Sequence, residues 1–305
     1  MDKEKDEKSY HEVNINWYPG HMAKTKRQII EDLKLIDIVA EILDARIPIS
    51  SRNPDIEQYI KDKDRLILLN KSDLADEEES NKWISYFNKN GISAIRINSN
   101  SGDGIKQAIK KMEDIYLEKQ EMYKTKGRIG KSIRVMVLGI PNVGKSSFIN
   151  RISKKSSALV GNKPGVTKQK QWIRVNENIE LLDTPGVLWP KFENEQVALN
   201  LAYTGSIKDD LLEITEIGFQ FLKFMRKEQL QNIVRRYKLD LNIVNNILNK
   251  EVDENDKILE IMHLIGEKRG AMLTGGDIDE EKISRILLDD FRSGKLGRIT
   301  LEKVK

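Results

Sequence analysis

The sequence predicts an α/β domain with a mostly parallel sheet and helices on both faces, followed by a small all-α domain. From about residue 35 to residue 186, short Ile/Leu/Val runs alternate with stretches that have apolar residues at helical spacing. From about Asn194 onward only the helical pattern continues. We therefore expect a flexible tail over 1–14, the α/β domain over 15–192 and the helical domain over 193–305.

Six apolar runs have the length and composition of strands. Most are continuous rather than alternating, as is typical of strands covered on both faces. They span residues 37–44, 65–70, 93–98, 133–139, 171–175 and 179–183. The polar and basic stretch 119–131 is expected to be an exposed connection.

Helical spacing predicts the remaining elements. In the first part of the chain, helices are expected over 77–90 and 105–119. In the second part they are expected over 216–226, 228–238, 243–250, 256–268 and 280–292. Thr274-Gly275-Gly276-Asp277 interrupts the pattern before the last of these helices.

Composition limits the class of protein. Hydrophobic residues make up 39% of the 305 residues and charged residues 33%, which is typical of a globular protein with a highly charged surface. The sequence has no cysteine, which excludes disulfides, cysteine-ligated zinc and lipid anchors on cysteine. No apolar run approaches the roughly 20 residues that span a bilayer, and the first residues lack a signal peptide's apolar stretch. A cytoplasmic protein is expected.

The clearest motif is the phosphate-binding loop pattern over residues 139–146, GIPNVGKS, which follows a predicted strand and precedes a helical run. In such a loop backbone N–H groups and a helix N-terminus bind phosphates. Lys145 would neutralise the β and γ phosphates, and the Ser146 hydroxyl would bind Mg²⁺. A simple glycine turn is the alternative, but the strand and helix context argues against it. The expected nucleotide contacts are Asn142, Val143, Gly144, Lys145, Ser146 and Ser147.

Asn70-Lys71-Ser72-Asp73 indicates which base the site accepts. Asp73 would accept hydrogen bonds from N1–H and the exocyclic amine of guanine, a donor pair that adenine lacks. Asn70 would tie this loop to the phosphate loop, and the Lys71 stem would lie along the ring. Alone, the motif is equally consistent with an Asn/Asp turn; beside a phosphate loop it predicts guanine. Asn98-Ser99 after the next strand would offer a backbone contact to the guanine O6.

Two further stretches complete the expected site. Asp183-Thr184-Pro185-Gly186 ends a strand, so Asp183 would hold Mg²⁺ through water and the Gly186 N–H would meet the γ phosphate. Thr167, in a polar loop before the next strand, would be a switch threonine that binds Mg²⁺.

Position 187 is valine, where many GTPases carry a glutamine that orients the attacking water. Valine cannot do this, so hydrolysis is slow or another group is brought in. His21, within residues 17–24 (WYPGHMAK), is the candidate, because an imidazole can orient or deprotonate water near neutral pH. The alternative is that His21 only stabilises a turn. His11 lies in the polar tail, and His263 is expected to be a packing residue.

The order of the motifs is unusual. The base-reading motif at 70–73 precedes the phosphate loop at 139–146, whereas ordinary GTPases have the reverse order. The sequence therefore predicts a circularly permuted P-loop GTPase domain.

In this order, NKSD, NSNSG, GIPNVGKS, GVT and DTPGV, preceded by WYPGHMAK, resemble the YlqF type of ribosome biogenesis GTPase A over essentially the whole chain. The resemblance implies assembly of the large ribosomal subunit, GTP hydrolysis stimulated by ribosomal particles, and a C-terminal helical domain that meets RNA. It implies His21 as a catalytic candidate and a response to K⁺ associated with Asn142. With Lys145 and Thr167 from the motifs above, the expected catalytic residues are His21, Lys145 and Thr167, with GTP as substrate and Mg²⁺ as cofactor. Tyr18 departs from the phenylalanine common in this family.

The evidence for RNA from the residues themselves is weaker. Basic residues cluster at 24–27 and 124–131, and recur in the helical domain at 226–227, 235–238, 268–269 and 292–298. On one face they would bind phosphates of shaped, double-stranded rRNA. They are equally consistent with ordinary solvated helix surface, because acidic residues are nearly as numerous.

The motif ending at Gly186 runs into the helical domain through Leu188-Trp189-Pro190, so loss of the γ phosphate would act on that domain. We expect a monomer that docks on immature large subunits with GTP and is released on hydrolysis, without membrane or DNA partners. Two alternatives stay open: a signalling GTPase acting on a protein partner, and a GTP-gated binding module without catalysis.

Overall fold

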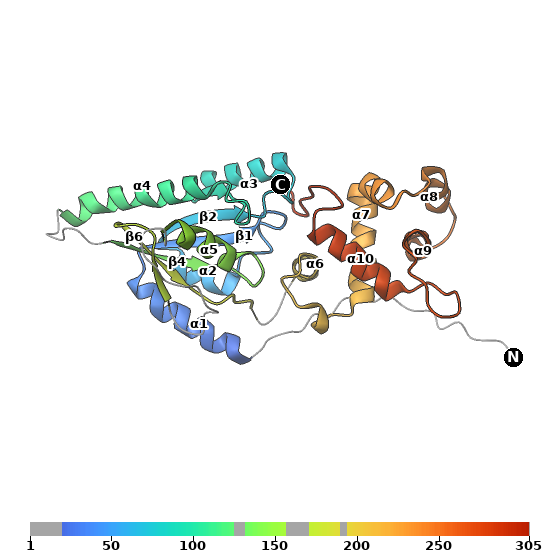
Figure 1. Cartoon of the computed structure of the whole chain (residues 1–305), viewed down its shortest axis with the longest axis horizontal. Helices are drawn as coiled ribbons and strands as arrows, with labels where there is room; N and C mark the ends of the chain where they lie inside the picture. Colours follow the sequence, from blue (N-terminus) through green and yellow to red (C-terminus); the bar gives the residue numbers. More distant parts are fainter. Residues whose placement is uncertain (1–19, 125–131, 157–170, 190–193, 305) are drawn as a thin grey trace. The chain divides into compact units, whose positions relative to one another are not determined.

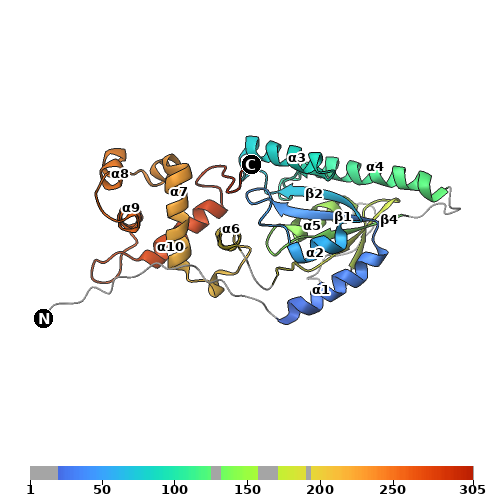
Figure 2. The same ribbon diagram turned by 180° about the vertical axis from the view of Figure 1, so that it is seen from behind.

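The computed structural model describes residues 20–124, 132–156, 171–189 and 194–304. The chain divides into two compact units, an α/β unit of Trp17–Lys191 with Arg298–Lys305, and a helical unit of Phe192–Gly297 (Figures 1 and 2). The sequence assigned residues through 305 to the helical domain. The last segment instead groups with the α/β unit because its backbone hydrogen-bonds there, as in the bond from Ile299 N to Leu74 O at 3.0 Å.

The described part of the α/β unit contains a six-stranded sheet in the order β3-β2-β1-β4-β6-β5. All neighbouring strands pair in parallel except β5 with β6. The strands are β1 Ile38–Asp44, β2 Asp64–Asn70, β3 Ser93–Arg96, β4 Ile133–Leu138, β5 Gln171–Arg174 and β6 Ile179–Asp183. Each of the six predicted strands is confirmed, with ends that differ by at most two residues.

Helices cover this sheet on both sides, and Figures 1 and 2 show α1 and α4 with the strands between them. All seven residues of β1 are therefore buried, which explains its unbroken apolar run. The helices are α1 Gly20–Asp32, α2 Pro54–Ile60, α3 Glu77–Lys89, α4 Ile105–Lys124 and α5 Lys145–Ser156, with a 3-10 turn at Leu33–Leu35. The exposed connection expected from residue 119 is helical as far as Lys124, and 125–131 lie outside the described residues.

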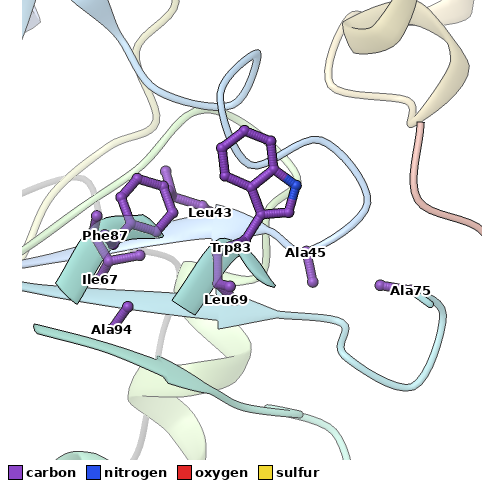
Figure 3. Close-up of a cluster of buried hydrophobic side chains, with 8 residues drawn as sticks. All are labelled: Leu43, Ala45, Ile67, Leu69, Ala75, Trp83, Phe87 and Ala94. Atoms are coloured by element: carbon purple, nitrogen blue, oxygen red, sulfur yellow. The ribbon is translucent and has the colours of Figure 1, made fainter. Parts of the chain in front are cut away.

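One core cluster fixes α3 on the sheet (Figure 3). Trp83 and Phe87 are four residues apart, so they lie on the same face of the helix. Their rings are 5.9 Å apart, and they pack with Leu43 of β1 and with Ile67 and Leu69 of β2. Residues 67 and 69 share a face because side chains alternate along a strand. This packing positions the ends of β1 and β2.

The helical unit contains α6 Glu195–Tyr203, α7 Ile214–Tyr237, α8 Leu241–Leu248, α9 Glu254–Arg269 and α10 Glu280–Arg292, with a 3-10 turn at Asp209–Leu211. The helices expected over 216–226 and 228–238 are the two segments of α7, which meet at a kink where Gln229 has non-helical backbone angles (φ −147°, ψ 34°). The other predicted helices of this unit are confirmed.

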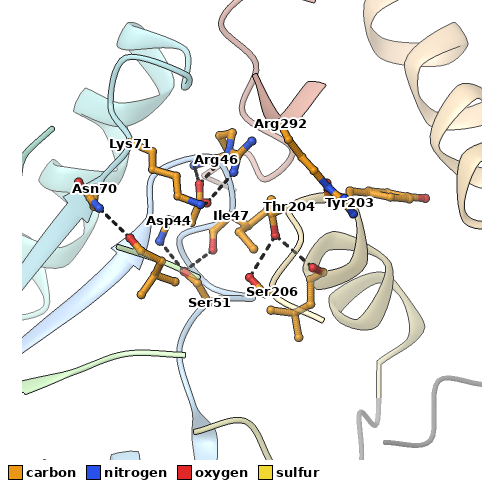
Figure 4. A network of polar contacts seen from close by, with 12 residues as sticks. Asp44, Arg46, Ile47, Ser51, Asn70, Lys71, Tyr203, Thr204, Ser206 and Arg292 are labelled. Carbon is orange, nitrogen blue, oxygen red and sulfur yellow. Dashed lines mark hydrogen bonds and ion pairs between the residues drawn. The ribbon is translucent and has the colours of Figure 1, made fainter. Parts of the chain in front are cut away.

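Ion pairs that are at least partly buried hold these helices together. Asp290 of α10 is 4% exposed and accepts hydrogen bonds from Arg236 Nε (2.8 Å) and Nη2 (2.9 Å) and from the Tyr237 hydroxyl (3.1 Å). Arg269 donates to the same carboxylate at 3.2 Å. Arg292 donates to both carboxylate oxygens of Asp209 at 2.8 Å and to the Tyr203 carbonyl, with its side chain visible in Figure 4. Three arginines of the expected RNA surface thus have partners within the unit.

Candidate nucleotide-binding site

The predicted motifs lie where parallel strands end. Asn70 ends β2, residues 98–99 follow β3, Gly139 follows β4 and Asp183 ends β6. The carboxyl ends of parallel strands share one edge of a sheet, which is where open α/β sheets bind ligands. The strand order therefore brings together motifs that are far apart in the sequence.

Asn70 joins three of these loops, and Figure 4 shows its bond to the phosphate loop. Its Nδ2 donates to the Val143 carbonyl of the phosphate loop at 2.7 Å. Its Oδ1 accepts from the Ser99 N–H and the Ser99 hydroxyl, both at 2.9 Å. Asn70 is 2% exposed, so these bonds form away from solvent. The tie that the sequence predicts between the base-reading loop and the phosphate loop is present.

The phosphate loop requires glycine at two close approaches. At Gly144, φ is 99°, and a Cβ there would overlap the Asn70 amide. At Gly139, a Cβ would lie 2.6 Å from the Ile42 carbonyl oxygen. Asn142 takes the left-handed conformation without being glycine (φ 61°), which asparagine tolerates better than most residues. The loop backbone is thus turned as a phosphate-binding loop requires.

Lys145 lies inside the phosphate loop. It is 7% exposed, and its Nζ donates to the Ile140 carbonyl at 2.8 Å. Burial lowers the pKa of Lys145 to about 8, and the charge of Asp183 offsets only part of that effect. A Cβ on Gly186 would lie 2.8 Å from the same Nζ, so the 183–186 motif closely approaches this lysine. An anion at this site would relieve the cost of the buried ammonium.

Lys71 is held by an ion pair that the sequence did not indicate. Its backbone is left-handed (φ 58°), and its Nζ lies 3.0 Å from Asp44 Oδ2. Asp44 is fully buried and also binds the Arg46 guanidinium at 2.9 and 2.8 Å (Figure 4). Burial would raise the pKa of Asp44, but Arg46 and Lys71 together hold it well below its usual range. The available signal in the sequence was the charged pair Asp44 and Arg46 at the end of a buried strand.

The loop after β3 is fixed from two sides. Arg151 of α5 donates to the Ser99 carbonyl at 3.2 Å, which links this loop to the phosphate-loop helix. Gly104 has φ 71°, and a Cβ there would overlap the Arg96 carbonyl. Asn98 is half-buried, and its side chain accepts from the N–H groups of Asn100 and Ser101. Asn98 therefore fixes the shape of this loop. In the neighbouring base-reading loop, the Asp73 side chain is exposed.

The side chain at position 187 is buried. The Val187 side chain is 3% exposed, and its carbonyl accepts a 2.9 Å bond from Asn53 Nδ2. Val187 lines a small pocket with Ile29, Leu138 and Pro185. The neighbouring Thr184 hydroxyl donates to the Val137 carbonyl at 2.5 Å, which fixes the start of the segment.

The expected Mg²⁺ residues are described only in part. Ser146 is exposed in the first turn of α5, and Asp183 is half-buried at the end of β6. Hydroxyl and carboxylate oxygens suit Mg²⁺, which keeps several waters and binds few protein groups. In the parts of the chain that the structure describes, no three His, Asp or Glu side chains form a metal-binding group. Thr167 lies outside the described residues, and so does the side chain of His21, although its backbone lies in the first turn of α1.

The comparisons with known proteins agree with this geometry. Residues 134–265 match the family model described as 50S ribosome-binding GTPase. The chain is 45% identical to "Ribosome biogenesis GTPase A" of Bacillus cereus over 288 residues, which cover 94% of this chain and 93% of that protein. It is 30% identical to the protein of the same name from Thermotoga maritima, covering 95% and 94%.

The chain belongs to the ribosome biogenesis GTPase A family. Solved structures of YlqF from T. maritima in its GNP-bound and GDP-bound forms align with a TM-score of 0.63 at 27% identity. The GNP-bound alignment covers 92% of this chain and 98% of that one. As a ribosome biogenesis GTPase A, the chain is a GTP-hydrolysing enzyme with a circularly permuted P-loop domain, as the order of its motifs predicts. The family-model match begins at β4 and leaves out residues 70–73, as that permutation requires. Among the described residues, no helix is long and apolar enough to cross a membrane.

Proposed function

We propose that this GTPase acts as an assembly factor for the large ribosomal subunit, docks on immature particles through rRNA and is released when it hydrolyses GTP. The hydrogen bond from Asn70 to Val143 carries the nucleotide half of the proposal, because it joins the base-reading and phosphate loops into one site. The names of the relatives support the ribosomal half.

In the proposed site, Asp73 and Asn70 read guanine, the Lys71 stem lies along the base, and residues 98–99 contact its O6. Backbone N–H groups of residues 142–147 and of Gly186 bind the phosphates, and Lys145 neutralises them. Ser146, Thr167 and Asp183 hold Mg²⁺, which supplies positive charge against the phosphates. Asn142, with its left-handed backbone, is proposed to help hold K⁺.

His21 is proposed to orient the attacking water. The support is the burial of Val187, which leaves no side chain at position 187 to contact a water. An imidazole suits this task near neutral pH. The first helix begins at residue 20, so its first turn carries the histidine.

The proposed rRNA surface uses exposed basic residues of the helical unit. Arg236, Arg269 and Arg292 are ion-paired within the unit, so they stabilise helices rather than reach for phosphate. The exposed candidates are Lys227, Arg235, Lys238 and Lys268, whereas Lys295 pairs with Asp290 at 3.5 Å. Binding through such residues would weaken steeply with salt, because each phosphate contact releases counterions.

The test measures GTP hydrolysis by the purified protein alone and with large ribosomal subunits, in potassium and in sodium buffer. Stimulation by subunits, larger in potassium, is the expected result. The His21→Ala variant should lose that stimulation and keep its GTP affinity. Stimulation that survives in the variant would remove His21 from the mechanism and keep the assembly function. If subunits never stimulate the wild type, the ribosomal proposal fails.

A further inference from the structure

The C-terminal strap, residues 298–304, lies along the base-reading loop of the α/β unit. Ile299 N donates to the Leu74 carbonyl at 3.0 Å, and Asp76 N donates to the Thr300 hydroxyl at 3.0 Å. Leu301 N donates to the Arg46 carbonyl at 2.8 Å. The strap therefore hydrogen-bonds to the loop after β2 and to the loop after β1.

Arg298 begins the strap, and its guanidinium bonds on both sides of Asp73. Nε donates to the Ala75 carbonyl at 2.8 Å, and Nη2 donates to the Ser72 carbonyl at 3.1 Å. A planar guanidinium holds two acceptors in a fixed geometry, which a lysine ammonium cannot do. Asp73 itself is exposed, so its position depends on the backbone of residues 72–75.

The rest of the strap is held firmly. The Glu302 carboxylate accepts from the N–H groups of Ile49 (2.6 Å) and Ser50 (2.9 Å). The Glu302 carbonyl accepts from Trp83 Nε1 at 2.9 Å, and Val304 packs against the core cluster of Figure 3. Arg298 therefore extends from a segment that is fixed to α3 and the sheet.

We propose that Arg298 is a positioning residue for guanine recognition. By binding the carbonyls of Ser72 and Ala75 it fixes the backbone of the loop, so that the Asp73 carboxylate is held ready for N1–H and the 2-amino group of the base. Preorganisation of this kind lowers the ordering cost of binding. The inference rests on the proposed function of Asp73. In the chain, Arg298 follows the end of α10 by a few residues and is the first residue of the segment that belongs to the α/β unit.

The test compares the dissociation constants of GDP and inosine diphosphate, which lacks the 2-amino group. In Arg298→Ala we expect the GDP dissociation constant to rise about tenfold and that of inosine diphosphate about threefold, the size of one or two lost hydrogen bonds. The wild-type preference for GDP therefore shrinks. Arg298→Lys keeps the charge but not the two-point geometry, and should show a smaller change in the same direction.

Arg96→Ala is the matched control. Arg96, at the end of β3, donates to the Glu77 carboxylate at 3.0 Å. Arg298 donates to the same carboxylate at 3.5 Å. This variant should keep the wild-type ratio of the two dissociation constants. A destabilised fold alone would lower the melting temperature and leave that ratio unchanged.

Asp73→Ala separates the two proposals. If it leaves the preference for GDP unchanged, the proposed base-reading site fails. If Asp73→Ala abolishes the preference while Arg298→Ala leaves it at the wild-type value, the inference about Arg298 is overturned and the base-reading site stands.

Discussion

At the scale of single residues, the site contains a lysine whose burial disfavours its charged form. Lys145 is buried among backbone atoms, with one carbonyl partner, and its pKa is lowered to about 8. Protonated below that pH, the ammonium destabilises the protein when no anion is bound. Such a cost is expected at a phosphate site, because the ligand removes it.

Lys145→Met tests this cost. The variant should lose GTP binding and yet be more stable than the wild type near pH 7 when no nucleotide is bound. The pKa is about 8 in the folded protein and 10.5 for an unburied lysine. Between these values the unfolded wild type binds more protons, so its stability rises with pH by up to about 3 kcal/mol. The advantage of methionine should therefore shrink from pH 8 to pH 10.5.

Urea unfolding at a series of pH values measures this difference. Ser153→Ala on α5 serves as the control, because the Ser153 hydroxyl makes an exposed hydrogen bond to the Asn150 carbonyl. The stability of this variant should change with pH as that of the wild type does. A methionine variant that is less stable at every pH would show that the Lys145 hydrogen bond outweighs its desolvation.

At the scale of elements, the sequence predicts those strands, helices and loops that local residue patterns determine. The strands are recognisable because each apolar run is buried on both faces, and the Asn70 tie is recognisable because the motif requires it. The break expected between the helices over 216–226 and 228–238 corresponds to the kink of α7 at Gln229, so the local pattern located it to within two residues. Helix α2 is missed because it has only seven residues, although Asn53 caps it with a 3.0 Å bond from Asp55 N. The Asp44–Lys71 pair and the C-terminal strap depend on partners that are distant in sequence, which local patterns do not show.

The loop after β1 offers a prediction at this scale. Asp44→Ala leaves the buried Arg46 without its carboxylate and releases Lys71. Breaking a buried ion pair from one side costs about 3–5 kcal/mol, so urea unfolding should show a loss of that size. Guanine nucleotide affinity should fall as well, because Lys71 is no longer held. Asp62→Ala, at an exposed position before β2, is the control and should change stability by less than about 0.5 kcal/mol. An equally small loss in Asp44→Ala would show that the pair contributes little.

At the scale of the whole molecule, the helical unit is inserted into the α/β unit. The chain leaves the α/β unit after Lys191, just beyond the 183–186 motif, and returns at Arg298, beside the base-reading loop. The two connections therefore leave from different parts of the α/β unit. Each unit has its own buried core, so we expect each to unfold as a unit of its own.

Calorimetry with and without GDP tests that expectation. GDP binds the α/β unit, so saturation at about 100 times its dissociation constant should stabilise that unit's transition by about 2.7 kcal/mol and leave the other in place. Asp290→Ala should do the reverse, since it removes the shared partner of Arg236 and Arg269 and lowers the transition of the helical unit by about 10 °C. Glu281→Ala removes only an exposed pair with Arg285 on the same helix and should shift neither transition measurably. If GDP and Asp290→Ala instead shift one common transition, the two units unfold together. The two connections between the units would then couple their stabilities.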